Sequence, residues 1–209
     1  MRILGLTGSI GMGKSAAAGT LRRLGVPVHD SDAAVHRAMN SGGAAVAAIR
    51  RAFPGVACQG VIDRSKLGAR VFGDPAALRR LEAIVHPLVR ASADRLLAAA
   101  ARRRAAIVAL DIPLLYETGA VARCDAVAVV SAPGFLQAQR VLRRKGMTPA
   151  RLAQILRRQV PDAVKRRRAD FVVSTGLGRE RSLRALKRAL RVLRRRPARA
   201  WRPGYAFLT

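Results

Sequence analysis

The sequence predicts an α/β fold in which a parallel β-sheet lies between two layers of helices. Short runs of apolar and β-branched residues alternate with longer stretches of helical periodicity, and this alternation is typical of a doubly wound sheet. The glycine-rich stretch TGSIGMGKS at residues 7–15 directly follows the first apolar run. A chain of 209 residues that is half hydrophobic suits one compact domain with insertions.

Five apolar runs are expected to be the buried strands of this sheet: residues 2–7, 26–30, 106–111, 126–131 and 170–174. They are short and rich in aliphatic side chains, as parallel strands buried on both faces are. Ligands of such sheets bind at the carboxyl ends of the strands. We therefore expect functional residues directly after these runs.

Helical stretches lie between the expected strands. Residues 14–24 have the pattern of a helix, and Gly25 and Pro27 are typical residues to end it. Near the C-terminus, leucines with helical spacing predict another helix: Leu183, Leu186, Leu190 and Leu193.

One long segment interrupts the alternation of strands and helices. Residues 33–104 are largely helical, with Asp74–Pro75 as the cap and first position of a helix. Pro87 is expected to kink or break that helix. We interpret the segment as a helical insertion over the ligand edge of a core formed by residues 1–32 and 105–209.

Two smaller arginine-rich segments follow. An insertion at about residues 140–168 contains a helix that begins at Thr148–Pro149 and carries apolar residues on one side. Residues from about 194 to 209 combine arginine and proline with Trp201 and have no clear period. We expect them to form a loosely attached basic tail.

The glycine-rich stretch matches the pattern G-x-x-x-x-G-K-[ST] and lies between an expected strand and an expected helix. In such a P-loop, glycines let backbone N–H groups surround a phosphate, and the following helix adds its positive dipole end. Lys14 would bind the β- and γ-phosphates, and Ser15 would bind Mg²⁺. A glycine-rich turn with a chance lysine would not explain the flanking elements. The predicted nucleoside triphosphate site is Gly8, Ser9, Ile10, Gly11, Met12, Gly13, Lys14, Ser15 and Ala16.

Two aspartates follow the second apolar run. On an extended strand end, the spacing of Asp30 and Asp32 turns both carboxylates to the same side. One would accept the proton of a substrate hydroxyl while the other orders Mg²⁺ or water. Alternatively, the segment caps the next helix through Ser31 or Asp32. Beside a P-loop, we favour the catalytic interpretation.

Asp111 ends the third apolar run. From this position an acid reaches Mg²⁺ directly or through water. The alternative is an ordinary turn at the strand end before Pro113. We favour the metal-linked role because a hard cation needs oxygen ligands close to the phosphates.

Several classes of protein are excluded by composition. Asn40 is the only asparagine, so the guanine-reading NKxD motif of GTPases and the protein-kinase loop H-R-D-x-x-x-x-N are both absent. Cys58 and Cys124 form no CxxC pair, which argues against a disulfide framework and favours a reducing, cytoplasmic setting. No apolar run reaches about 18 residues, and no cleavage-like segment follows the start. We expect a soluble protein that does not bind membranes.

The formal charge of +28 favours anionic partners. Arginine runs such as residues 102–104 are also typical of solvated helix faces. The charge raises one alternative, a nucleic-acid-binding protein that uses ATP as a switch and binds with a steep salt dependence. Aromatic residues are sparse and no reading motif is present, so we expect no specific nucleic acid.

The order and spacing of motifs along nearly the whole chain resemble the dephospho-CoA kinase family. The matching segments are GLTGSIGMGKS (5–15), VHDSD (28–32), GVIDR (60–64), IVHP (84–87), DIPLLYE (111–117), QAQRVLRR (137–144), ILRRQ (155–159) and ADFVV (169–173). The resemblance implies a three-layer P-loop core, a helical acceptor-binding insertion and a small lid. It also implies that ATP, with Mg²⁺, donates its γ-phosphate to the 3′-hydroxyl of dephospho-CoA. The nearest alternative is another P-loop nucleoside or nucleotide kinase.

The resemblance also implies roles for single residues. Asp32 matches the general base, and Lys14 and Arg140 are the other expected catalytic residues. His86 is an expected acceptor contact, although it could equally be a core or helix-end histidine. The full set of expected acceptor-binding residues is Asp30, Asp32, Arg64, His86, Pro113 and Leu114.

The lid-like segment supplies further expected contacts to ATP. Arg140 and Arg144 are the expected arginines, since guanidinium groups bind phosphates and stack on bases. Nearby competitors are Arg143, Arg157 and Arg158, and Gln159 matches the lid glutamine of the family.

Two positions depart from the family pattern. Ala16 replaces a hydroxyl residue, and Thr175 stands where an asparagine beside the adenine is usual. The second departure bears on selectivity for the base. We expect a monomer or a small homo-oligomer.

Overall fold

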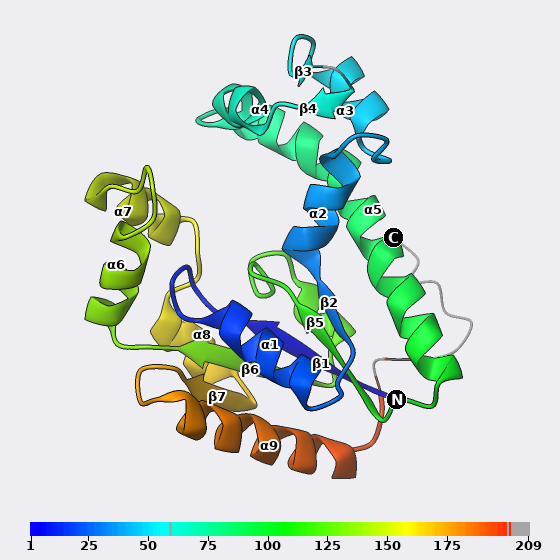
Figure 1. Ribbon diagram of the computed structural model, residues 1–209, viewed down its shortest axis with the longest axis vertical. Helices are drawn as coiled ribbons and strands as arrows, with labels where there is room; N and C mark the ends of the chain where they lie inside the picture. Colours follow the sequence, from blue (N-terminus) through cyan, green and yellow to red (C-terminus); the bar gives the residue numbers. More distant parts are fainter. Residues whose placement is uncertain (59, 200, 202–209) are drawn as a thin grey trace. The chain divides into compact units, whose positions relative to one another are not determined.

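The computed structural model describes residues 1–58, 60–199 and 201 (Figure 1). The chain divides into two compact units. The first comprises Met1–His29 and the described residues from Leu97 onward, and the second comprises Asp30–Leu96. Each unit has its own hydrophobic core. No helix within the described ranges is long and apolar enough to cross a membrane.

The first unit is built on a five-stranded sheet. Its strands are β1 (Arg2–Thr7), β2 (Val28–Asp30), β5 (Ile107–Asp111), β6 (Ala126–Ser131) and β7 (Phe171–Ser174). Their order is β2-β5-β1-β6-β7, and β1 pairs in parallel with both β5 and β6. All five strands lie within the predicted runs, and the predicted parallel α/β fold is confirmed. Because β1 is central, the loop that follows it lies in the middle of the carboxyl edge.

Both faces of the sheet are buried. Helices α1 (Lys14–Arg23) and α9 (Arg179–Arg195) pack on one face, where Ala128 and Val130 of β6 meet the core (Figure 1). Val127 of β6 points to the other face and packs in a cluster with Leu115. This alternation along a strand explains why β6 is buried at every position.

The first helix ends by a Schellman arrangement, as Gly25 and the following proline predict. Gly25 has a φ of 77°, a left-handed conformation that suits glycine. Its N–H donates to the carbonyl of Arg22, and the N–H of Val26 donates to that of Leu21, both at 3.0 Å. These two bonds satisfy carbonyls that the last helical turn leaves unpaired.

The predicted leucine stripe is confirmed, because Leu186, Leu190 and Leu193 of α9 are buried. The expectation of a loosely attached tail is wrong for its described part. The guanidinium of Arg196 lies 2.5 Å from Asp170, and the N–H of Arg199 donates to Asp125 at 2.6 Å. Tail residues 200 and 202–209 lie outside the described part of the chain.

Three further helices of the first unit are α6 (Gly134–Leu142), α7 (Pro149–Arg157) and α8 (Asp162–Arg168). The predicted start of α7 is confirmed, since the Thr148 side chain accepts a hydrogen bond from the N–H of Arg151 at 3.2 Å. A threonine cap followed by proline is a common helix start.

The second unit is mainly helical. Its elements are α2 (Ser31–Met39), α3 (Val46–Ala52), β3 (Ala57–Cys58), β4 (Val61–Ile62), α4 (Arg64–Val71) and most of α5 (Pro75–Arg102). The short antiparallel pair β3–β4 was not predicted, because two-residue strands have too little periodicity to be seen. A break at Pro87 is wrong: α5 runs through it, since a proline removes a single hydrogen bond from a helix of 28 residues.

A buried ion pair joins α8 to the loop after β5. The Lys165 side chain is completely buried, and its Nζ lies 2.8 Å from Oε1 of Glu117. The same carboxylate accepts a hydrogen bond from the N–H of Val160 at 2.8 Å. Burial alone would raise the pKa of Glu117, but the bonds from Lys165 and Val160 outweigh it and hold the pKa below its ordinary value of 4.5.

We predict that Lys165→Met lowers the free energy of unfolding by about 3 kcal/mol at neutral pH, because it leaves Glu117 without its cation. The pKa of Glu117 is lower in the folded chain than its ordinary value of 4.5. The stabilisation from the pair is therefore complete above about pH 4.5 and is lost as the pH falls through the folded pKa. Urea unfolding should therefore show a constant difference from the native chain between about pH 7 and about pH 5, and a shrinking difference as the pH falls below about 4.5. Lys187→Met, on the exposed face of α9, is the matched control. A pH-independent difference would contradict this account.

Candidate active site

The loop of residues 8–13 joins β1 to α1, as the P-loop motif predicts. Gly11 and Gly13 have φ values of 77° and 90°, where side chains cause strain. Gly8 is required for a different reason: a Cβ there would lie 2.5 Å from the carbonyl oxygen of Val130. Each glycine therefore permits a backbone position that alanine would disturb.

Side chains from distant segments bind the backbone of this loop. Gln137 Nε2 donates to the carbonyl of Ile10 at 2.8 Å. The N–H of Ile10 donates to Oε1 of Gln159 at 3.1 Å. The hydroxyl of Thr175 donates to the carbonyl of Met12 at 2.6 Å. These hydrogen bonds to three peptide groups of the loop hold it in one conformation.

The P-loop lysine contacts the aspartate at the end of β5. Lys14 Nζ lies 2.6 Å from Oδ1 of Asp111, whose side chain is almost completely buried. Ser15, the next residue of α1, is exposed. The three predicted residues are therefore all at the carboxyl edge of the sheet, around the loop.

The residues present suit Mg²⁺. The Asp111 carboxylate and the Ser15 hydroxyl offer the oxygen atoms that this cation prefers. In the described part of the chain, no group of three or more His, Cys, Asp and Glu side chains could hold a metal by itself. A site with few protein ligands is typical of Mg²⁺ that is bound together with substrate phosphates.

Of the predicted lid arginines, Arg140 contacts the loop. One guanidinium nitrogen, Nη1, lies 3.4 Å from the carbonyl of Gly11 and 3.1 Å from Oγ1 of Thr175. The other, Nη2, donates to the carbonyl of Thr175 at 3.0 Å. Arg144 is exposed, as are the competing residues Arg143, Arg157 and Arg158.

The predicted residues Asp30 and Asp32 belong to the second unit. The strand ends at Asp30, and Asp32 lies in the first turn of α2. The prediction that both residues lie on one extended strand end, with their carboxylates on the same side, is therefore wrong. The cap was also assigned to the wrong residue, because Asp30 accepts the hydrogen bond from the N–H of Ala33 at 2.9 Å. Asp32 is exposed.

Arg64 follows the cap residue Asp63 and is the first residue of α4. Its guanidinium nitrogens lie 3.0 and 2.7 Å from the two ring nitrogens of His36. A neutral imidazole has one acceptor nitrogen, so only one of these contacts is a hydrogen bond. Sequence reasoning missed His36, since nothing in its spacing links α2 to α4.

His86 lies inside α5 and is exposed. Both structural alternatives, a core histidine and a helix-end histidine, are therefore wrong. In the first unit, Pro113 accepts a hydrogen bond from the Thr7 hydroxyl at 2.9 Å, and the Leu114 side chain is exposed.

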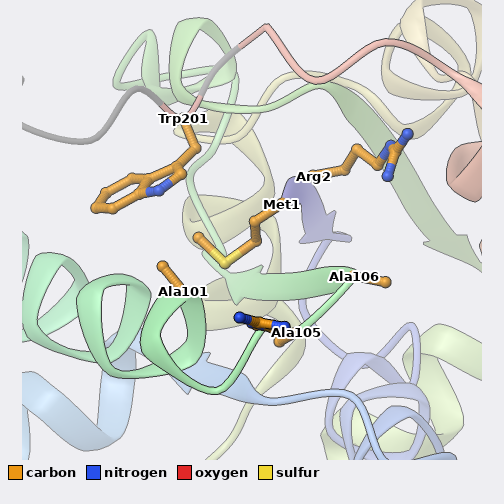
Figure 2. A pocket seen from close by; sticks show the side chains of 7 residues that line it. Met1, Arg2, Ala101, Ala105, Ala106 and Trp201 are labelled. Carbon is orange, nitrogen blue, oxygen red and sulfur yellow. The ribbon is translucent and has the colours of Figure 1, made fainter.

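A hollow of about 440 Å³ lies elsewhere in the first unit (Figure 2). Arg2, Arg104 and Trp201 are among the residues that line it. Arg2 begins β1, whereas the P-loop follows the end of the same strand. Ligands of parallel sheets bind at the carboxyl ends, so we do not assign this hollow to the nucleotide.

We predict that Gly8→Ala weakens ATP binding by at least about tenfold, equivalent to about 1.4 kcal/mol. The added methyl group would meet the backbone of Val130, which cannot move as a side chain could. Gly19→Ala in α1 is the control, since a Cβ there would lie 3.9 Å from Nη1 of Arg23, an ordinary van der Waals distance. Titration calorimetry should show native affinity for the control. Equal affinity for both variants would contradict the steric argument.

Known proteins resemble this chain over most of its length. The family model for dephospho-CoA kinase matches residues 2–178. A dephospho-CoA kinase of Paramagnetospirillum magneticum is 65% identical over 166 residues, covering 79% of this chain and 78% of that protein. A dephospho-CoA kinase of Rhodospirillum rubrum is 59% identical over 204 residues, covering 97% of this chain and 96% of that protein. The crystal structure of TT1252 from Thermus thermophilus has a TM-score of 0.79 at 38% identity, covering 91% of this chain and 96% of that one. This chain therefore belongs to the dephospho-CoA kinase family and is a kinase with the P-loop fold.

Proposed function

We propose that this chain transfers the γ-phosphate of ATP to the 3′-hydroxyl of dephospho-CoA, using the residues around its P-loop. The observation that carries the proposal is the 2.6 Å contact between Lys14 and Asp111 at the carboxyl edge of the sheet. It brings a phosphate-binding ammonium and a metal-binding carboxylate to the same place, beside a loop with the backbone conformation for a triphosphate.

The donor side of the reaction belongs to the P-loop unit. ATP binds through the backbone of residues 8–16, and Lys14 binds its β- and γ-phosphates. Ser15 and Asp111 would hold Mg²⁺, which when bound supplies positive charge that offsets the charge of the phosphate oxygens. The positively charged guanidinium of Arg140 stabilises the negative charge that develops on the transferred phosphate.

The acceptor side belongs to the helical segment and the loop after β5. Asp32 takes the proton of the 3′-hydroxyl as the ribose oxygen attacks the γ-phosphorus. The bond from that phosphorus to the bridging oxygen breaks, and ADP leaves. Acceptor contacts come from Asp30, Arg64, His86, Pro113 and Leu114, with His36 orienting Arg64. A cytoplasmic setting is the one that the two cysteines, which form no CxxC pair, support.

We predict that the purified chain forms ADP and CoA from ATP and dephospho-CoA, and that EDTA abolishes the reaction by removing Mg²⁺. Chromatography of both products checks this. Nucleosides and nucleotides at the same concentration should be poor acceptors, since the helical segment serves the larger acceptor. Turnover of a nucleoside with none of dephospho-CoA would overturn the proposal, as would ATP hydrolysis without transfer.

We predict that Asp32→Asn lowers kcat by about two orders of magnitude and leaves ATP affinity unchanged, because the amide cannot accept the proton. Steady-state kinetics and calorimetry measure the two quantities. Asp63→Asn is a control for loss of a carboxylate in the same unit, since Asp63 caps α4. A rate of Asp32→Asn equal to that of the native chain would remove Asp32 from the role of base.

A further inference from the structure

Thr175, the residue directly after β7, makes polar contacts with two separate parts of the site. Its hydroxyl lies 2.6 Å from the carbonyl oxygen of Met12 in the P-loop. The same hydroxyl lies 3.1 Å from Nη1 of Arg140, and the Thr175 carbonyl lies 3.0 Å from Nη2. One residue thus joins the loop to the lid arginine.

The chemistry of these groups fixes the direction of each hydrogen bond. A carbonyl oxygen only accepts, so the single hydroxyl proton of Thr175 goes to Met12. The guanidinium of Arg140 only donates, so it must use a lone pair of the same hydroxyl. The two acceptors of Thr175 bind two nitrogens of Arg140, which restrains both the position and the plane of the guanidinium.

The P-loop is shaped to admit this side chain. A Cβ at Gly13 would lie 2.9 Å from Oγ1 of Thr175 and 3.2 Å from its Cβ. Gly13 therefore serves two purposes: it adopts a φ of 90°, and it leaves room for the threonine. The hydroxyl lies against Gly13, the residue that precedes Lys14 in the chain.

We propose that Thr175 is a positioning residue for phosphoryl transfer, whose hydroxyl fixes Arg140 against the P-loop carbonyl of Met12. The inference rests on the proposed function and on the role of Arg140 within it. It differs from the expectation that this position bears on selectivity for the base. A threonine here acts on the geometry of the phosphate site.

The first test removes the hydroxyl and keeps the shape. Thr175→Val leaves Met12 without a donor and Arg140 without one acceptor, so we expect kcat to fall roughly tenfold or more. Thr175→Ser keeps the hydroxyl, so its kcat should stay within about threefold of the native value. Thr20→Val is the matched control, because the Thr20 hydroxyl bonds within its own helix, to the carbonyl of Ala16 at 3.0 Å. If Thr175→Val does not fold, Thr175→Ala replaces it.

A double-mutant cycle with Arg140 separates positioning from a general structural effect. If Thr175 acts through Arg140, Thr175→Val should change kcat by less than about twofold in an Arg140→Met background. If the two substitutions instead lower kcat independently, so that their fold-changes multiply in the double variant, the proposal is overturned. So would a kcat of Thr175→Val equal to the native value.

Hydrogen exchange gives a readout that does not depend on catalysis. Amides of residues 10–13 should exchange faster in Thr175→Val than in Thr175→Ser, while those of β6 stay unchanged, because a lost hydrogen bond frees the loop locally. Unchanged exchange in the loop overturns the positioning role. Altered loop exchange in a chain that forms no CoA would instead count against the proposed function alone.

Discussion

The active site depends on the fixed conformation of the P-loop backbone. Glycines permit this conformation, but they also give the loop conformational freedom in the unfolded chain that folding must remove. Hydrogen bonds from Gln137, Gln159 and Thr175 to its peptide groups restrain it in the folded chain. These residues come from α6, the α7–α8 connection and the segment after β7, so the restraint on the loop depends on three separate parts of the first unit.

The ion pair between Glu117 and Lys165 belongs to the same system of restraints. Glu117 binds the N–H of Val160, and the preceding residue, Gln159, binds the N–H of Ile10. The buried ammonium of Lys165 therefore fixes Glu117, which binds the segment of Gln159 and Val160, and this segment in turn binds the P-loop. Buried pairs add little net stability, but they are costly to break, which makes them suitable for fixing one arrangement of neighbouring segments.

Most of the first unit could be predicted from the sequence. The strands are continuous apolar runs, and the P-loop combines glycines, lysine and serine at a spacing with a known physical purpose. The attachment of Arg196 and Arg199 could not be predicted, since it depends on aspartates far away in the chain. Local cues also failed at Asp30, where three consecutive polar residues could each have capped the helix. The contacts of Thr175 had no sequence signal, because a threonine after a strand is unremarkable until the fold brings Met12 to it.

The contact between Lys14 and Asp111 has a consequence for which form of ATP the site accepts. In this arrangement the two opposite charges already neutralise each other. A triphosphate that arrives alone brings its negative charge towards this carboxylate as it draws the ammonium away. A triphosphate that carries its divalent ion offers each partner a replacement, so the exchange conserves charge balance. We therefore expect the pair to favour a nucleotide that carries its divalent ion over the metal-free nucleotide.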